Sequence, residues 1–245
     1  MLSSMHAPCV LAWLAFRASG ARQGRRPSHI EAVVFDLDGV LVDSEHVWDA
    51  ARKELAAERG RPWPEQASRG MMGMSSLEWS RYMHDIVGLP EPPEEISAKV
   101  VRRLEELYRR ELPLIDGAVE AVERLAERWP LGLASSSNRE LIDLVLELSG
   151  LARYFLATVS SEEVPRGKPA PDVYLEATRR LGVAPARCVA IEDSENGIRS
   201  AKAAGMRVLA IPNPRYPPGE EALGLADEVL RSIDELTPET IERVG

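Results

Sequence analysis

The chain comprises 245 residues, of which 44% are hydrophobic and 28% are charged, and it carries a formal net charge of −9. A chain of this size can bury one sizeable hydrophobic core and a smaller second one. The excess of acidic residues and an aromatic content of only 5% argue against binding to nucleic acid, and no apolar run approaches the roughly 20 residues that a membrane span needs. Two cysteines, Cys9 and Cys188, cannot form a disulfide framework or a zinc site, so we expect a cytoplasmic protein.

The first 29 residues differ from the rest of the chain. They contain an apolar run, Cys9–Phe16, of about eight residues, which is at the short limit for a secretory signal. No Lys or Arg precedes this run, and the basic cluster Arg22, Arg25 and Arg26 follows it. A signal peptide is one interpretation, but we favour a disordered or helical tail, or a start codon placed too far upstream. We therefore expect the folded core to begin at residue 30.

Short aliphatic or β-branched runs alternate with amphipathic stretches along the remainder of the chain. Helical periodicity fills the intervals between these runs, for example at Leu141, Leu144, Val145 and Leu148. This alternation predicts an α/β fold with a doubly wound, mostly parallel sheet covered by helices. The predicted strands are Ala32–Phe35, Leu131–Ala134, Leu156–Val159, Val189–Ile191 and Val208–Ile211, with a weaker sixth strand, Glu228–Leu230, at an edge.

One interval, from Gly39 to Pro130, breaks this alternation because it contains no strand-like run. We expect residues 30–43 and 113–245 to form the core, and residues 44–112 to form a small helical cap over the sheet. The periodicity within the interval predicts helices at Ser44–Arg59, Ser75–Val87 and Pro93–Glu111, and a further helix at Gly117–Arg128 that returns to the sheet.

Polar side chains follow four of the predicted strands. The carboxyl ends of parallel strands meet at one edge of a doubly wound sheet, which is where such folds bind ligands. We therefore expect one crevice to gather the residues at all four strand ends, namely Asp36 and Asp38, then Ser135, Ser136 and Ser137, then Lys168, and finally Glu192 and Asp193.

These residue types indicate phosphoryl transfer. Crowded carboxylates repel one another unless a cation lies among them, and an all-oxygen set of ligands suits Mg²⁺. Lys168 and the N-terminus of the helix that begins after Ser137 provide an anion-binding half of the site. A cation beside a phosphate-binding surface is the arrangement that phosphoryl transfer uses.

The segment D-L-D-G-V-L-V-D-S at Asp36–Ser44 resembles the first motif of the haloacid dehalogenase superfamily. Ser135, Lys168 and the pair Glu192–Asp193 are similar to its second, third and fourth motifs, in the same order. Each motif alone is weak, whereas four of them in register at strand ends are specific. The resemblance extends from Ala32 to the C-terminus, and it implies that the helical insertion is the small cap that this superfamily places between its first two motifs.

The resemblance also implies a role for each matching residue. Asp36 would be the nucleophile that forms an aspartyl-phosphate, and Asp38 would protonate the leaving oxygen and then accept a proton from water. An acid at this position fits phosphate esters better than halides, because a halide departs without a proton. Implied ligands of Mg²⁺ are Asp36, the backbone carbonyl of Asp38, Asp193 and, as a ligand or its support, Glu192; implied ligands of the phosphoryl group are Ser135, the backbone N–H groups of Ser136 and Ser137, and Lys168.

Substrate selection is expected in the cap segment Arg69–Trp79. Its glycines permit a close approach to the crevice, and its methionines adapt to varied apolar surfaces. The alternative is that Met72, Met74 and Trp79 belong to the core of the cap. The first cap helix carries His46 and Trp48, and we expect at most one of them to face the site, because residues two positions apart lie on different helix faces.

The leading functional hypothesis is a Mg²⁺-dependent phosphatase that hydrolyses a small phosphorylated metabolite, such as a sugar phosphate. The first alternative is a phosphotransferase similar to β-phosphoglucomutase. Mutases of that kind use a cap histidine and basic residues in the cap loop, whereas Trp48 and a Met-rich loop stand in those places here. The second alternative is a phospho-accepting signalling module, which has neither a cap nor an acid like Asp38. No long hydrophobic seam calls for a partner, so we expect a monomer.

Overall fold

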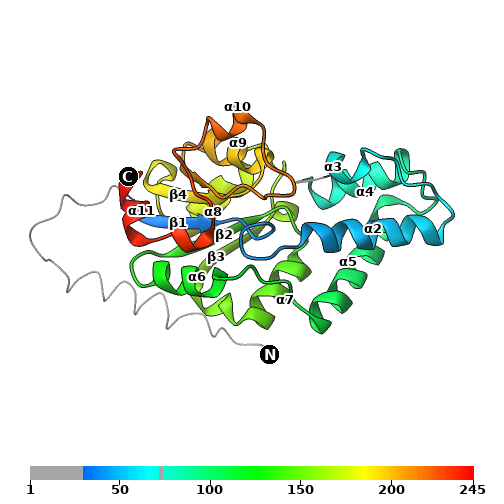
Figure 1. The fold of residues 1–245 in the computed structure, drawn as a ribbon, viewed down its shortest axis with the longest axis horizontal. Coiled ribbons are helices and arrows are strands. Elements are labelled where there is room, and N and C mark those ends of the chain that lie inside the picture. The colour runs from blue at the N-terminus through cyan, green and yellow to red at the C-terminus, as the bar shows by residue number, and fades with distance from the viewer. Residues whose placement is uncertain (1–29, 72–73) are drawn as a thin grey trace, which may run out of the picture.

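The computed structural model describes residues 30–71 and 74–245, and the tail predicted at residues 1–29 lies outside the described residues. The described chain forms a six-stranded sheet in the order β3-β2-β1-β4-β5-β6, with every neighbouring pair parallel (Figure 1). All six predicted strands are present, and the weak sixth one lies at an edge as expected. Their bounds are Ala32–Phe35 (β1), Leu131–Ser135 (β2), Phe155–Ser160 (β3), Cys188–Glu192 (β4), Arg207–Ala210 (β5) and Glu228–Val229 (β6).

Helices cover both faces of the sheet, because successive side chains along each buried strand point to opposite faces. Val33 and Phe35 of β1 pack in the cluster that contains α6 (Ala118–Ala126), α7 (Arg139–Ser149) and α11 (Pro238–Arg243). Val34 packs in a second cluster with α8 (Asp172–Leu181) and α9 (Glu195–Ala203). The prediction of a doubly wound α/β fold is confirmed. Shorter elements are α10 (Glu220–Leu223) and the 3₁₀ helices η1 (Leu151–Tyr154), η2 (Ser161–Glu163), η3 (Pro185–Arg187) and η4 (Ile233–Glu235).

Four helices between β1 and α6 lie to one side of the sheet, and we refer to them as the cap helices (Figure 1). They are α2 (Glu45–Glu58), α3 (Ala67–Gly70), α4 (Ser76–Asp85) and α5 (Pro93–Arg110). The four-residue α3 was not predicted, because it is too short to show a helical period. The two connections to the core run side by side, since the N–H of Asp43 donates to the carbonyl of Pro113 at 2.8 Å and Val42 bridges Leu114 in antiparallel fashion.

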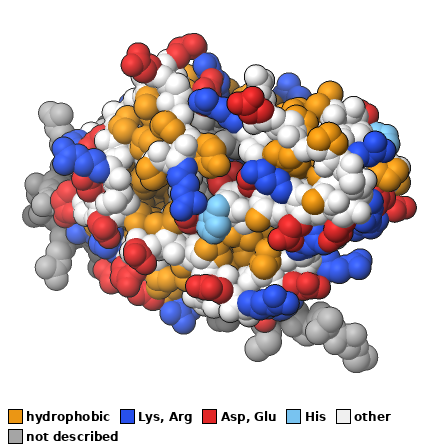
Figure 2. Space-filling view, turned by 45° about the vertical axis from the view of Figure 1, so that its right-hand side comes forward, with side chains coloured by type: hydrophobic (Ala, Val, Ile, Leu, Met, Phe, Trp, Pro, Cys, Tyr) orange, Lys and Arg blue, Asp and Glu red, His pale blue; other side chains and the backbone are white. Residues whose placement is uncertain are grey.

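The face where core and cap helices meet carries interspersed acidic and basic side chains with hydrophobic patches between them (Figure 2). None of the described helices combines the length and the apolar composition needed to cross a membrane.

Candidate active site

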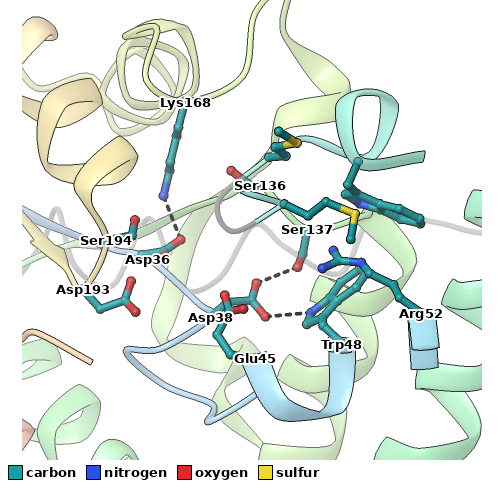
Figure 3. Close-up of a pocket in the computed structure, with 13 residues that line it drawn as sticks. Asp36, Asp38, Glu45, Trp48, Arg52, Ser136, Ser137, Lys168, Asp193 and Ser194 are labelled. Carbon is teal, nitrogen blue, oxygen red and sulfur yellow. Dashed lines mark hydrogen bonds and ion pairs between the residues drawn. The ribbon is translucent and has the colours of Figure 1, made fainter. Parts of the chain in front are cut away.

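A pocket lies between the carboxyl edge of the sheet and the cap helices, and its cavity measures about 50 Å³ (Figure 3). Its walls come from residues far apart in the sequence. The core side comprises Asp36, Asp38, Ser136, Ser137, Lys168, Asp193 and Ser194, and the cap side comprises Glu45, Trp48, Arg52, Met71, Met74 and Trp79. Most of the residues predicted from the strand ends therefore do share one crevice.

Lys168 makes the central ion pairs of this pocket. Its Nζ lies 2.8 Å from Oδ1 of Asp36 and 2.6 Å from Oε1 of Glu192. All three groups are shielded from solvent, with 3% of Lys168, 5% of Asp36 and 0% of Glu192 exposed. Because buried charges need both a counter-charge and hydrogen bonds, this triad fixes the lysine beside the proposed nucleophile.

Both carboxylate oxygens of Glu192 are occupied by protein donors. Oε1 accepts from Lys168 and from the Tyr174 hydroxyl at 2.6 Å, while Oε2 accepts from the N–H of Asp193 at 3.1 Å and from the hydroxyl of Ser194 at 3.1 Å. Gly197 of α9 leaves the room for this carboxylate, since a Cβ there would lie 1.9 Å from its Cδ. Of the two interpretations of Glu192, metal ligand or support, this geometry favours support of Lys168.

Three buried carboxylates, those of Asp36, Glu192 and Asp193, have oxygen atoms that all lie within 4.8 Å of one another. Burial raises the pKa of Asp36 to about 8, and the neighbouring Glu192 adds to this effect although Lys168 opposes it. Burial likewise raises the pKa of Asp193 well above its ordinary value, and Glu192 adds to it. The cluster thus lacks positive charge, and a divalent cation would supply it.

The backbone after β1 also suits a cation site. Gly39 has a φ of +81°, and a Cβ at this position would lie 1.9 Å from Oδ2 of Asp193. Glycine is therefore required twice, once for the left-handed backbone and once for the close approach of the Asp193 carboxylate to the turn that carries Asp38. The oxygen donors at this turn fit Mg²⁺, which prefers carboxylates, carbonyls and waters.

Asp38 accepts hydrogen bonds at both of its carboxylate oxygens. Oδ1 accepts from the Ser44 hydroxyl at 2.5 Å and from Nε1 of Trp48 at 3.3 Å. Oδ2 accepts from the hydroxyls of Ser137 at 2.6 Å and Ser135 at 3.3 Å. Ser44 is the residue before α2, so Asp38 joins the start of the cap to the serines after β2.

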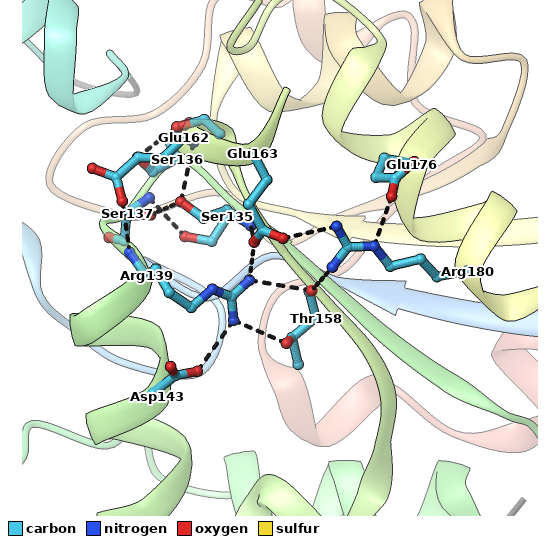
Figure 4. Close-up of polar contacts among 12 residues, drawn as sticks. Ser135, Ser136, Ser137, Arg139, Asp143, Thr158, Glu162, Glu163, Glu176 and Arg180 are labelled. Carbon is cyan, nitrogen blue, oxygen red and sulfur yellow. Dashed lines mark hydrogen bonds and ion pairs between the residues drawn. The ribbon is translucent and has the colours of Figure 1, made fainter. Parts of the chain in front are cut away.

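Ser135, Ser136 and Ser137, which we call the serine loop, connect β2 to α7 (Figure 4). The carbonyl of Ser137 accepts from the Ser160 hydroxyl at 2.7 Å, and the carbonyl of Ser136 accepts from the Ser161 hydroxyl at 3.0 Å. The buried Ser135 hydroxyl accepts from the N–H of Ser137 at 3.0 Å, so it orders the loop itself. Only Ser136 and Ser137 of the three line the pocket.

A charged network behind the serine loop fixes the start of α7 (Figure 4). The N–H of Arg139 donates to Glu162 at 2.9 Å, and its guanidinium binds Thr158 Oγ1 at 3.0 Å and pairs with Glu163. Arg180 of α8 pairs with the same Glu163 at 2.7 Å. This network ties the end of β3 to both α7 and α8, and it holds the helix N-terminus at the pocket.

The cap residues divide as predicted between the pocket and the surface. Trp48 lines the pocket, whereas His46 is exposed and lies 3.8 Å from Asp43. In the segment Arg69–Trp79, Met71, Met74 and Trp79 line the pocket, and Trp79 is also buried in the cap core. Selection of the substrate by this segment stays a prediction. Met72 and Gly73 lie outside the described residues.

Sequence reasoning gave no role to four residues of the site, namely Glu45, Arg52, Tyr174 and Ser194. Glu45 and Arg52 lie within a predicted amphipathic helix, where charged residues usually face solvent. Tyr174 carried no motif, and only the folded contact with Glu192 shows its role. Ser194 follows the fourth motif directly, and its adjacency was a usable signal.

A buried lysine and a cluster of buried carboxylates lie in one pocket between a parallel sheet and the cap helices, which is an arrangement that suits a capped α/β hydrolase. The chain belongs to the haloacid dehalogenase-like hydrolase family, whose family model matches residues 30–205. The resemblance inferred from the four motifs is thereby confirmed.

Individual relatives are similar to this chain over most of their length. The chain is 36% identical to hexitol phosphatase B of Escherichia coli K12 over 218 residues, covering 86% of this chain and 96% of that protein. It is 33% identical to the phosphorylated carbohydrates phosphatase of Thermotoga maritima over 179 residues, covering 72% and 82%. The crystal structure of CbbY from Rhodobacter sphaeroides in complex with phosphate superposes with a TM-score of 0.75 at 30% identity, covering 84% and 96%.

Proposed function

We propose that the protein is a Mg²⁺-dependent phosphatase that hydrolyses a small phosphorylated metabolite through an aspartyl-phosphate on Asp36. The observation that carries this proposal is the placement of Asp36 in one pocket with Lys168, at 2.8 Å, and with Asp38. A buried carboxylate beside a fixed cation and a second carboxyl group has the parts for nucleophilic attack on phosphorus and for proton transfer.

In the first step, a carboxylate oxygen of Asp36 attacks phosphorus, and the bond from phosphorus to the leaving alcohol oxygen breaks. Lys168 neutralises phosphoryl charge on the nucleophile's own side of the pocket. Ser136 and Ser137 of the serine loop line the same pocket, and their backbone N–H groups would provide donors for the remaining oxygens. Loss of one such donor typically removes about 3 kcal/mol of transition-state stabilisation.

Asp38 transfers the protons in both steps. It protonates the leaving oxygen as the ester bond breaks, and it takes a proton from the water that then attacks the aspartyl-phosphate. Three of its four hydrogen-bond partners are the hydroxyls of Ser44, Ser135 and Ser137, and a hydroxyl can rotate to donate or to accept. Asp38 can therefore be held in place with or without its proton.

Mg²⁺ would be held by the side chains of Asp36 and Asp193 and by the backbone carbonyl of Asp38, with Glu192 as their neighbour. When bound, the ion neutralises carboxylate and phosphoryl charge within the buried site. Asp193 is directed to this position by the turn at Gly39, and Glu192 keeps Lys168 at the opposite side of Asp36.

The substrate is proposed to be small because the pocket is narrow and is closed by the cap. A cavity of about 50 Å³ leaves space for a few atoms only, and we propose that the cap opens to admit the substrate and then closes to exclude water. The names of two relatives, a hexitol phosphatase and a phosphorylated carbohydrates phosphatase, support a sugar or polyol phosphate as the substrate.

The test is release of inorganic phosphate from a panel of phosphorylated metabolites with Mg²⁺, with β-glucose 1-phosphate and a coupled glucose 6-phosphate assay included. Release of phosphate from one or a few compounds, abolished by EDTA and by D36N, is the expected result. Glucose 6-phosphate formed without free phosphate would establish the mutase instead. No turnover of any compound, or turnover that is independent of metal, would contradict the proposal.

A further inference from the structure

Arg52 is a buried arginine whose guanidinium lies against two indole rings but forms no ion pair with any described residue. It lies on the cap helix α2, only 6% of it is exposed, and it lines the pocket with Asp38 and Lys168. Figure 3 shows its guanidinium directed at the pocket beside Ser137. A buried charge is costly, and such a residue is normally found with a counter-ion and several hydrogen bonds.

Arg52 has neither a hydrogen bond nor an ion pair with any described residue, and its Nε is a buried donor without an acceptor. Burial lowers the pKa of Arg52 to about 10, with the nearby carboxylates of Glu45 and Asp49 opposing the shift, so the group stays protonated at neutral pH. Guanidinium N–H groups that have no acceptor in a closed pocket indicate that the ligand supplies the acceptor.

Two indole rings hold this guanidinium in place. Its Cζ lies 4.7 Å from the centre of the Trp48 ring and 4.8 Å from that of Trp79, and the two rings meet edge to face at 5.7 Å and 67°. Contact with both rings fixes the plane of the fork, so its N–H groups are preorganised. The same indoles offer apolar surface to the carbon chain of a ligand.

The charges around Arg52 indicate a neutral acceptor. The carboxylate of Glu45 lines the same pocket, and Asp38 and Asp49 are also close enough to raise the pKa of Arg52. A second anionic group on the substrate would meet the carboxyl groups of Glu45 and Asp38, which line the pocket, as well as the guanidinium. A hydroxyl oxygen accepts from Arg52 without that repulsion, and its proton can be donated to a carboxylate such as Glu45.

We propose that Arg52 is a specificity-determining residue that binds hydroxyl oxygens at the end of the substrate remote from the phosphate. The preferred substrate is then the monophosphate of a neutral polyol or sugar, and compounds with a carboxylate or a second phosphate at that end are discriminated against. This inference rests on the proposed phosphatase function, and it specifies that the leaving group of the substrate is a neutral polyol or sugar.

The experiment compares kcat/KM for sorbitol 6-phosphate with that for n-butyl phosphate, which has no hydroxyl group on its leaving group. R52M keeps the unbranched stem between the indoles and removes the donors, and R52K keeps the charge without the fork. We expect R52M to reduce kcat/KM for sorbitol 6-phosphate by roughly ten- to a hundredfold, the range of a charge-assisted hydrogen bond. Butyl phosphate should change by less than about threefold.

Controls separate folding from recognition. Arg102 is exposed on the cap helix α5, so R102M is a matched control that should leave both substrates unchanged. Retained hydrolysis of butyl phosphate shows that R52M is folded, and if R52M does not fold, R52K answers the same question with an expected selective loss on sorbitol 6-phosphate. In the wild type, 3-phosphoglycerate and fructose 1,6-bisphosphate should be poorer substrates than sorbitol 6-phosphate.

The outcomes distinguish the two proposals. An equal loss for both substrates in the Arg52 variants, or no loss for either, would overturn the role of Arg52 while leaving the phosphatase intact. A wild-type preference for the carboxylated or bisphosphorylated compounds would overturn the neutral class. Absence of Mg²⁺-dependent phosphate release from every compound would overturn the proposed function and this inference with it.

Discussion

Replacement of Gly197 by alanine tests whether the position of the Lys168 side chain depends on the position of the Glu192 carboxylate. A Cβ on Gly197 would lie 1.9 Å from Cδ and 1.9 Å from Oε1 of Glu192, whereas ordinary contact begins at 3.4 Å. The carboxylate must therefore retreat by about 1.5 Å, or α9 must shift by a similar amount. Either movement breaks the 2.6 Å contact with Lys168 and releases a lysine that sits 2.8 Å from Asp36.

The expected effect of G197A is a fall in kcat of roughly a hundredfold or more, because displacement of a catalytic group by about 1 Å has that consequence. The sign of the change in Tm distinguishes the effect of helix propensity from the effect of the clash. Alanine is favoured over glycine inside a helix by about 1 kcal/mol, so helix propensity alone predicts a higher Tm. The clash predicts a lower Tm, since it disturbs a buried ion pair whose disruption costs about 3–5 kcal/mol.

The assay for G197A is Mg²⁺-dependent phosphate release together with thermal unfolding, and G219A is the matched control. A Cβ at Gly219 meets only Oε2 of Glu195 at 3.5 Å, so this variant should keep both rate and Tm. Wild-type kcat and a raised Tm in G197A would refute the reasoning that Glu192 positions Lys168.

Three further results are expected. D36N should be folded and should retain less than about 1% of wild-type turnover, since an amide is too poor a nucleophile to form the intermediate, and a higher residual rate would remove Asp36 from that role. W48F removes the donor 3.3 Å from Asp38 and should lower kcat by roughly two- to tenfold, whereas an unchanged kcat would show that this bond is not needed. Folding raises the pKa of Asp36 from 3.8 to about 8, so the proton on this carboxyl group contributes to the stability of the fold. This contribution is complete below pH 3.8 and is lost as the pH rises through about 8. In EDTA the Tm should therefore fall across that interval, and it should not fall when Mg²⁺ is saturating; equal slopes with and without the metal would contradict the cation site.

The sheet and the polar strand ends were predictable because both depend on local sequence. Three of the strands are short hydrophobic runs followed directly by residues of the site, as Phe35 leads to Asp36, Ala134 to Ser135 and Ile191 to Glu192. Parallel topology then brings the strand ends together without further information. The paired aspartates and Lys168 could therefore be assigned to one crevice before any contact was known.

Roles that depend on side-chain contacts could not be predicted in this way. A glutamate at this position suits a metal ligand, and only its contacts in the fold, among them the hydroxyl of Tyr174 from a distant helix, favour a role in supporting Lys168. Ser135 fits a phosphate-binding motif, yet its hydroxyl is engaged within the serine loop. Arg52 follows a helical period and reads as a solvent-exposed charge, and its burial results from the packing of α2 against Trp79 of α4.

The central claim is that phosphate passes through a covalent bond to Asp36, and it is tested most directly by mass spectrometry of the trapped protein. D38N should slow hydrolysis of the intermediate more than its formation when p-nitrophenyl phosphate is the substrate, because that leaving group departs without a proton. After an acid quench, we expect the added mass of one phosphoryl group on the peptide that contains Asp36, and borohydride reduction of the acyl phosphate should convert this residue to homoserine. A variant that turns over substrate with no modification at Asp36, or with the phosphoryl group on another residue, would contradict the account.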